Sequence, residues 1–348
     1  AGLAMAAAGA MIGALVAATP AQAQADRTAI PAAATPPPAA AQDALERAEA
    51  WVCGAPSLIE RPTLTARRFN PAAADPNAPW MAKLEIVERL FDDGGMAVAN
   101  CGAAAVSPHW LLTAAHCVGG YEGWVSLRAT LGARDIESRS AVRRTGAVAL
   151  CHQDYDSETL AYDLALVRLA EPLPQDFPLL RIAGEREAAA LERGAVAHAA
   201  GWRVDAGGAI ATTLSRSAVE IIETSAGPDG VIVAGPRRDF ERSLCVGESG
   251  APLVGDLGRG PVALGVFSSV DALVDPGSGA LLELCYGREA RSYFTALRGL
   301  KSWIAGALAA CDSDLDACLG GAPAGAPAAT ETARRDGAEP ARRPARAR

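Results

Sequence analysis

Three residues in this sequence could together activate a nucleophile. Ser249 has one glycine two positions before it and another directly after it, His116 follows Thr-Ala-Ala and precedes a cysteine, and Asp163 opens the apolar run Leu164–Leu169. A serine hydroxyl is a weak nucleophile near neutral pH, so it needs a base to take its proton and a third group to orient that base. The three residues supply one group for each task. The sequence therefore predicts nucleophilic chemistry at Ser249.

Ordinary structural roles are open to the same residue types. His116 could be a buried structural histidine and Ser249 a turn serine, but the flanking Thr-Ala-Ala, cysteine and glycines favour a reactive site. Asp163 could cap a strand, yet an unpaired carboxylate at the start of an apolar run would be costly to bury. Asp154 and Asp156 are competing carboxylates in a polar loop. We therefore expect Asp163 to be the partner of His116.

Short apolar runs alternate with turn signals over two stretches, about 69–180 and 194–294. Evenly spaced short strands with glycine-rich turns indicate antiparallel barrels or sandwiches rather than alternating strands and helices. Apolar residues then recur at helical spacing over about 296–310, which predicts one helix packed on the strands. The predicted fold class is all-β with a C-terminal helix.

The two ends of the chain differ from the middle. Residues 1–25 carry no charge and place an apolar stretch before small residues, which is typical of a secretory signal and too short for a membrane span. The alternative is a disordered alanine-rich leader. We expect a linker and pro-segment over 26–68, and a cysteine-containing end with a disordered Ala/Pro/Arg tail over 311–348. These features predict export, so the protein would be secreted or periplasmic.

The composition of the chain bears on which partners and cofactors it binds. The net charge of −8 disfavours nucleic acid, and no segment predicts a transmembrane helix. The eight cysteines are an even number, as expected in an oxidising compartment. The sequence has no Cys-x-x-Cys pair and its four histidines are scattered, whereas a zinc site needs clustered ligands. We expect no metal and no other cofactor.

Several cysteine pairings suit this arrangement. A Cys101–Cys117 disulfide would pin the loop beside His116, and a Cys245–Cys285 disulfide would join the loop before Ser249 to a loop across a substrate pocket. The remaining cysteines, by elimination, are Cys53 with Cys151 and Cys311 with Cys318. Sequence alone does not determine connectivity, and free buried thiols are the alternative.

In these motifs and their order, the chain resembles the chymotrypsin/trypsin-like serine proteases, as a secreted member of bacterial type. The resemblance covers about Trp80–Ile304. It implies two six-stranded antiparallel β-barrels, about 69–185 and 190–296, with the active site in the cleft between them. It also implies a serine endopeptidase that hydrolyses proteins or peptides through an acyl-enzyme.

The resemblance assigns a role to each residue of the site. His116 would be the general base and later the general acid, and Asp163 would hold the other imidazole nitrogen. The backbone N–H groups of Gly247 and Ser249 would form the oxyanion hole, where glycine lets the backbone turn its N–H inward.

The resemblance also places four residues in the substrate pocket. Ser243 stands where trypsin-like members have the aspartate that binds Lys or Arg, and the strand containing Ser268 resembles the wall that pairs with the substrate backbone. Val270 and Ser292 each replace a glycine that would leave the pocket open. The neutral, narrowed pocket is similar to that of elastases, which implies cleavage after small aliphatic residues such as Ala or Val.

Other hydrolase classes fit the order of residues poorly. An α/β-hydrolase needs its histidine after its serine, and no histidine follows His198. A subtilisin-like order would use an aspartate before His116, but the parallel-sheet pattern of that fold is missing. A catalytically silent relative that keeps the fold as a binding module is the remaining alternative, although such proteins usually lose a triad residue and here none is lost.

Activation departs from the family pattern. No Ile-Val-Gly-Gly terminus lies upstream of Trp80, and the acid before the nucleophile is Glu248 rather than aspartate. One hypothesis is a zymogen cut after Arg67 or Arg68, whose new ammonium group reaches Glu248. The other is a chain active without processing, in which Glu248 pairs with an internal arginine or with backbone donors.

Overall fold

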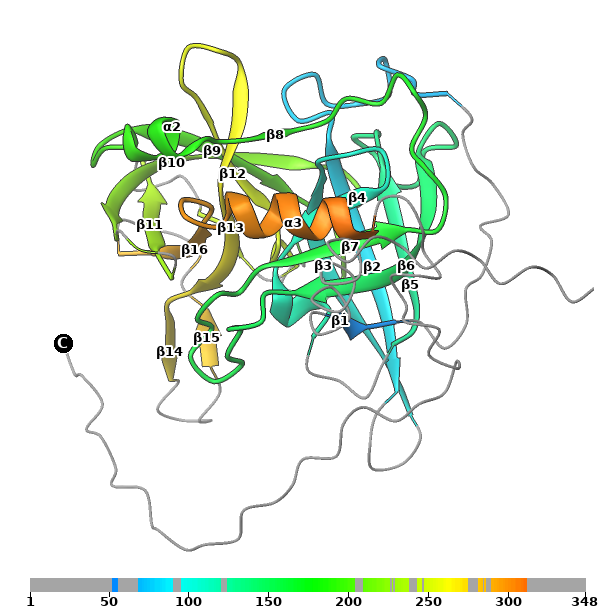
Figure 1. Ribbon diagram of the computed structural model, residues 1–348, viewed down its shortest axis with the longest axis horizontal. Coiled ribbons are helices and arrows are strands. Elements are labelled where there is room, and N and C mark those ends of the chain that lie inside the picture. The colour runs from blue at the N-terminus through cyan, green and yellow to red at the C-terminus, as the bar shows by residue number, and fades with distance from the viewer. Residues whose placement is uncertain are drawn as a thin grey trace, which may run out of the picture. The chain divides into compact units, whose positions relative to one another are not determined.

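The computed structural model describes residues 52–55, 68–89, 95–119, 124–203, 209–225, 227, 229–237, 243–245, 247–274, 281–283, 285 and 289–311 (Figure 1). The expected signal peptide, Arg67, most of the linker and pro-segment, Cys318 and the expected tail from residue 312 onward lie outside this range. The pairing of Cys311 with Cys318 and the nature of both ends therefore stay predictions.

The first sheet closes into a barrel of six antiparallel strands. Its order is β6–β5–β2–β3–β4–β7, and β7 pairs back onto β6. The strands are β2 (Met81–Arg89), β3 (Met96–Ala105), β4 (Trp110–Thr113), β5 (Trp124–Leu131), β6 (Val142–Cys151) and β7 (Ala165–Leu169). A seventh strand, β1 (Val52–Gly54), adds to β6, and the Cys53–Cys151 disulfide holds it there. The segment expected to be linker thus contributes a strand, because a covalent bond anchors it.

The second sheet closes in the same way. Its order is β12–β9–β10–β11–β16–β13, with β13 pairing back onto β12. The strands are β9 (Val196–Gly201), β10 (Ser215–Thr224), β11 (Val231–Pro236), β12 (Pro252–Asp256), β13 (Pro261–Val270) and β16 (Ser292–Ala296). A short β8 (Arg181–Ile182) runs parallel to β13, and β14 (Ala272–Val274) pairs with β15 (Leu281–Glu283). The expected fold of two six-stranded barrels is confirmed.

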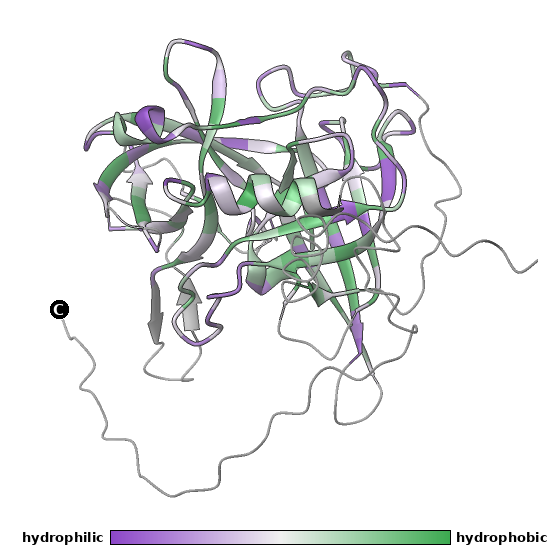
Figure 2. Ribbon diagram, in the orientation of Figure 1, coloured by the Kyte–Doolittle hydropathy of each residue, from purple (hydrophilic) through white to green (hydrophobic). Residues whose placement is uncertain are grey.

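Burial follows the strand periodicity. Along β10, Ser217, Val219 and Ile221 are buried while the residues between them are more exposed, as a sheet with one inner face requires. Figure 2 shows long hydrophobic stretches along the barrel strands and a mainly hydrophilic α2 (Glu185–Ala189). The inner face of β10 therefore contributes its buried side chains to the second barrel.

The C-terminal helix α3 spans Lys301–Cys311, so it starts about five residues later than expected. Gly299 has a φ of +84°, which is not helical, and Leu297 is held by its N–H bond to Leu264 O at 2.9 Å. The helix buries Trp303 and Ile304. Within the described residues, no helix combines the length and apolar character needed to cross a membrane.

Candidate active site

Asp163 is fully buried at the end of the loop before β7, and three donors surround its carboxylate. The backbone N–H of His116 donates to Oδ1 at 2.8 Å, and His116 Nδ1 lies 2.7 Å from Oδ2. The hydroxyl of Ser268 also donates to Oδ2, at 2.5 Å. A buried carboxylate is stable only when it is paired in this way, and the arrangement fixes the orientation of the imidazole.

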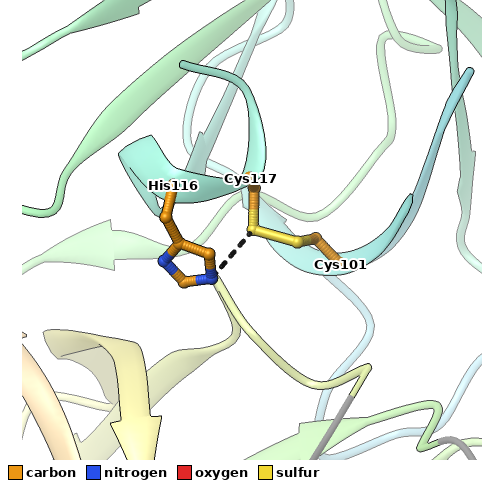
Figure 3. Close-up of side chains that lie close together, drawn as sticks. All are labelled: Cys101, His116 and Cys117. Atoms are coloured by element: carbon orange, nitrogen blue, oxygen red, sulfur yellow. Dashed lines mark hydrogen bonds between the residues drawn. A yellow bond between two sulfur atoms is a disulfide. The ribbon is translucent and has the colours of Figure 1, made fainter. Parts of the chain in front are cut away.

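His116 belongs to the short helix η2 (Ala115–Cys117), whose other two residues are buried. The disulfide Cys101–Cys117 ties this helix to β3, and Figure 3 shows His116 Nε2 directed toward Cys117 Sγ, 3.8 Å away. The side chain of His116 remains 26% exposed. His116 is therefore held at its backbone N–H and at Nδ1, while its side chain reaches solvent.

The three side chains in Figure 3 also have the composition of a metal site. Ligand atoms of Cys101, His116 and Cys117 lie within 4.8 Å of one another. Both sulfurs are bonded to each other in the disulfide, so neither is a thiolate, which is the form of cysteine that ligates metals. The disulfide instead ties Cys117, the residue after His116, to β3.

Ser249 lies on the turn that precedes β12. Its carbonyl oxygen accepts the N–H of Gly102 at 2.6 Å, which links the turn to β3 of the first barrel. Gly250 follows with a φ of +80°, and a Cβ at this position would overlap Thr113 Oγ1 and Gly102 O. Only glycine permits this approach, which brings the serine turn against the segment that leads into His116.

Ser249 Oγ and His116 Nε2 are not joined by a hydrogen bond, although the structure describes both residues. In substrate-free enzymes this contact is often long, and it tightens when substrate binds.

The backbone of the same turn presents two unused donors. Gly247 is buried with a φ of +84°, and neither its N–H nor that of Ser249 has a protein acceptor among the described residues. By contrast, the N–H of Glu248 bonds to Cys245 O at 3.1 Å and that of Gly250 to Phe267 O at 2.8 Å. A pair of free N–H groups flanking a bonded one is the arrangement that can stabilise an oxyanion.

Glu248 is buried beneath this turn. Its Oε2 accepts the backbone N–H of Cys245 at 2.9 Å, so the acid meets a backbone donor inside the chain. Gly201 makes room for it, since a Cβ at 201 would lie 2.8 Å from Glu248 Cγ. The Cys245–Cys285 disulfide anchors the start of the same loop.

The expected pocket residues separate into two groups. The hydroxyls of Ser243 and Ser292 are hydrogen-bonded to each other, and both residues are fully buried. Val270 is the neighbour of Ser292 across the β13–β16 pair. Ser268 has a role that sequence reasoning missed, because its hydroxyl bonds to Asp163, 105 positions away. No local motif could signal that contact.

The site thus draws on both barrels. His116 and Asp163 come from the first barrel, whereas Ser249 and Ser268 come from the second, and the Ser268–Asp163 bond crosses between them. The arrangement offers an imidazole oriented by Asp163 and, on the Ser249 turn, two N–H donors without a protein acceptor among the described residues.

Comparison with known proteins finds similarity to serine proteases. The family model described as Trypsin matches residues 69–278, a range that contains His116, Asp163 and Ser249. The chymotrypsin of Phaedon cochleariae is 27% identical over 205 residues, which cover 54% of this chain and 73% of that protein.

Two longer relatives come from Drosophila melanogaster. Serine protease filzig is 30% identical over 172 residues, or 44% of this chain and 10% of its own length. Serine proteinase stubble is 30% identical over 223 residues, or 58% of this chain and 27% of its own length. These relatives are animal proteins and lend no support to a bacterial type. With the family model covering more than half of it, the chain belongs to the trypsin family of serine proteases.

Proposed function

We propose that this protein is an exported serine endopeptidase that cleaves peptide bonds through an acyl-enzyme on Ser249. The observation that carries the proposal is the buried Asp163 paired with His116 Nδ1 at 2.7 Å, beside a turn with two free N–H donors. The three disulfides in the described part of the chain support a place in an oxidising compartment. A silent binding module is not favoured, because every group that the chemistry needs is retained.

The chemistry follows from this geometry. With Nδ1 engaged by Asp163, Nε2 of His116 carries the lone pair that takes the Ser249 proton as Oγ attacks the scissile carbonyl carbon. The carbonyl oxygen becomes an oxyanion that the N–H groups of Gly247 and Ser249 stabilise; losing one such donor costs about 100-fold or more in rate. His116 then protonates the leaving amine. His116 next takes a proton from water, which attacks the acyl carbonyl; the carboxylic acid product leaves as Ser249 Oγ recovers its proton.

A serine-directed phosphonate tests this proposal. The wild-type protein should be labelled covalently and lose activity, whereas Ser249→Ala should take no label. The matched control is Ser225→Ala, which changes an exposed serine outside the site and should label like wild type. Labelling of Ser249→Ala, or none of the folded wild type, would contradict the proposal.

We also propose that substrates are cleaved after small aliphatic residues. The support is the buried hydrogen-bonded pair of Ser243 and Ser292, together with Val270, the neighbour of Ser292 across the β13–β16 pair. None of these three described residues carries a charge that could bind Lys or Arg.

Profiling with a peptide library measures this specificity. Wild type should prefer Ala or Val, and the double variant Val270→Gly with Ser292→Gly should cleave after Leu or Phe at least about tenfold better relative to Ala. A dominant Arg, Lys or Phe preference in wild type would reject the assignment.

We further propose that the chain is active without a freed terminus near Arg68. Glu248 already accepts a backbone N–H from Cys245. Phe69, the residue after Arg68, is anchored elsewhere, with its ring 5.2 Å from that of Phe177 and its N–H 3.4 Å from Asp176 Oδ1. These contacts leave Glu248 with no need of a new ammonium group.

The test is the double variant Arg67→Gln with Arg68→Gln. It should retain wild-type activity, and N-terminal sequencing of the active wild-type species should not find a terminus at residue 68 or 69. An inactive variant, with wild type starting at either position, would instead establish the zymogen.

A further inference from the structure

The backbone leading into Asp163 is unusual. Leu160 and Tyr162 have φ values of 57° and 53°, and they are the only residues besides glycine with a positive φ in the described part of the chain. The N–H of Leu164 bonds to Tyr162 O at 2.7 Å, which makes a three-residue turn centred on Asp163. Bulky residues rarely adopt a left-handed conformation, and they keep it only where the surrounding structure holds them.

One residue, His152, contacts this turn on both sides of Asp163. Its ring stacks on the ring of Tyr162, with centroids 4.6 Å apart and planes inclined by 8°. Its backbone N–H bonds to Leu164 O at 3.0 Å. The residues before and after the carboxylate therefore both contact His152.

His152 is itself fixed in place. It is buried, and its Nδ1 accepts the backbone N–H of Asp154 at 3.2 Å, which leaves the ring neutral. Burial lowers the pKa of His152, in keeping with that neutral form, although the Asp154 carboxylate acts in the opposite direction. The indole of Trp303 on α3 lies 5.1 Å from the His152 ring. A line of aromatic contacts thus joins the C-terminal helix to the turn at Asp163.

We propose that Tyr162, held in a left-handed conformation by its stack on His152, is a positioning residue for the Asp163 carboxylate. The proposal rests on the proposed peptidase function and adds a residue to its machinery. Tyr162 touches no reacting atom; it sets the direction in which the next residue leaves the turn. Asp163 can then receive both the N–H and the Nδ1 of His116.

Four variants distinguish the contribution of the Tyr162 ring from that of its left-handed backbone. Tyr162→Phe keeps the ring, Tyr162→Ala removes it, and Tyr162→Gly removes both the ring and the left-handed penalty. Leu160→Gly is the matched control, since Leu160 shares the positive φ but lies outside the stack with His152.

The measurement is kcat per active site, counted by phosphonate titration, together with KM. Tyr162→Ala and Tyr162→Gly should lower kcat per site about tenfold and leave KM within about twofold, because misplacing a catalytic group slows the chemical step. Tyr162→Phe and Leu160→Gly should match wild type. A merely structural role would reduce the number of titrated sites and leave kcat per site unchanged, and that result would overturn the proposal, as would an equal loss in Leu160→Gly.

A second readout does not depend on activity. In a Ser249→Ala background, the proton on His116 Nδ1 should give a downfield NMR signal that Tyr162→Ala weakens or shifts and Tyr162→Phe preserves. An unchanged signal in Tyr162→Ala would refute the positioning role. Failure of the wild type to label with phosphonate, alongside the expected NMR pattern, would refute the peptidase proposal alone.

Discussion

At the residue scale, the carboxylate of Asp163 determines what the site can do. Its two oxygens receive three hydrogen bonds, two from His116 and one from Ser268. Because the residue has no exposed surface, water cannot replace a lost donor easily. The Ser268 hydroxyl therefore keeps Oδ2 in line with the imidazole.

Removing this hydroxyl should weaken both the fold and the reaction. We expect Ser268→Ala to cost about 1–2 kcal/mol of unfolding free energy, since a buried acceptor loses a partner. The loss of orientation should lower kcat by roughly tenfold. Urea denaturation and steady-state kinetics measure the two effects.

The control for Ser268→Ala is Ser269→Ala, the next residue of β13, which should change neither quantity by much. Equal effects in the two variants would mean that the strand, and not the bond to Asp163, is responsible.

At the element scale, β2 carries a buried charge in the first barrel. Lys83 is only 5% exposed, and its Nζ donates to Asn100 Oδ1 on β3 at 2.9 Å. Burial lowers the pKa of Lys83 from its ordinary 10.5 to about 8, despite the opposing charge of Glu85. Desolvation therefore outweighs the attraction, and the protonated side chain destabilises the strand.

This leads to a prediction for Lys83→Met. The folded pKa lies below the unfolded value, so the cost of protonated Lys83 is complete below pH 8 and fades as the pH rises toward 10.5. At pH 7 the methionine variant should be more stable than wild type by about 1–3 kcal/mol, with the gap narrowing at pH 9.5. Denaturant unfolding at pH 7 and pH 9.5 measures this difference in unfolding free energy. A variant less stable than wild type at pH 7 would contradict the account.

At the scale of the whole molecule, the two barrels approach each other closely beside Ser249, and we expect the proposed catalysis to depend on that approach. Gly102 on β3 faces Ala251, the residue before β12, and a Cβ at 102 would lie 3.1 Å from the Ala251 methyl group and 3.2 Å from its backbone. The same glycine donates its N–H to Ser249 O. The backbone of Ser249, the proposed nucleophile, is thus held by a contact from the opposite barrel.

Gly102→Ala should push this contact apart. We expect kcat per active site to fall about tenfold, with a stability loss of about 1–3 kcal/mol from overpacking. Adding Ala251→Gly should recover part of both, since it removes one of the tight contacts. Kinetics with active-site titration measures the rescue.

Gly306→Ala is the control for Gly102→Ala, because a Cβ at position 306 of α3 meets nothing within 4 Å. It should leave kcat unchanged. Full activity in Gly102→Ala would show that the barrels tolerate a wider separation.

Local patterns in the sequence were enough to predict the all-β fold and the disulfides Cys101–Cys117 and Cys245–Cys285, and elimination added Cys53–Cys151. Strand periodicity, turn glycines and short motifs are properties of neighbouring residues, so they can be read along the chain. Even there, the anchored strand β1 and the later start of α3 differed from expectation.

Only the tertiary structure decided which distant groups meet. The Ser268–Asp163 bond, the Ser243–Ser292 pair and the stack of Tyr162 on His152 depend on how strands and loops pack. Composition and spacing carry no record of such contacts, because each one joins residues that are not neighbours in the chain. The sequence by itself determined which chemical groups are present, and the closing of the barrels decided how they are held.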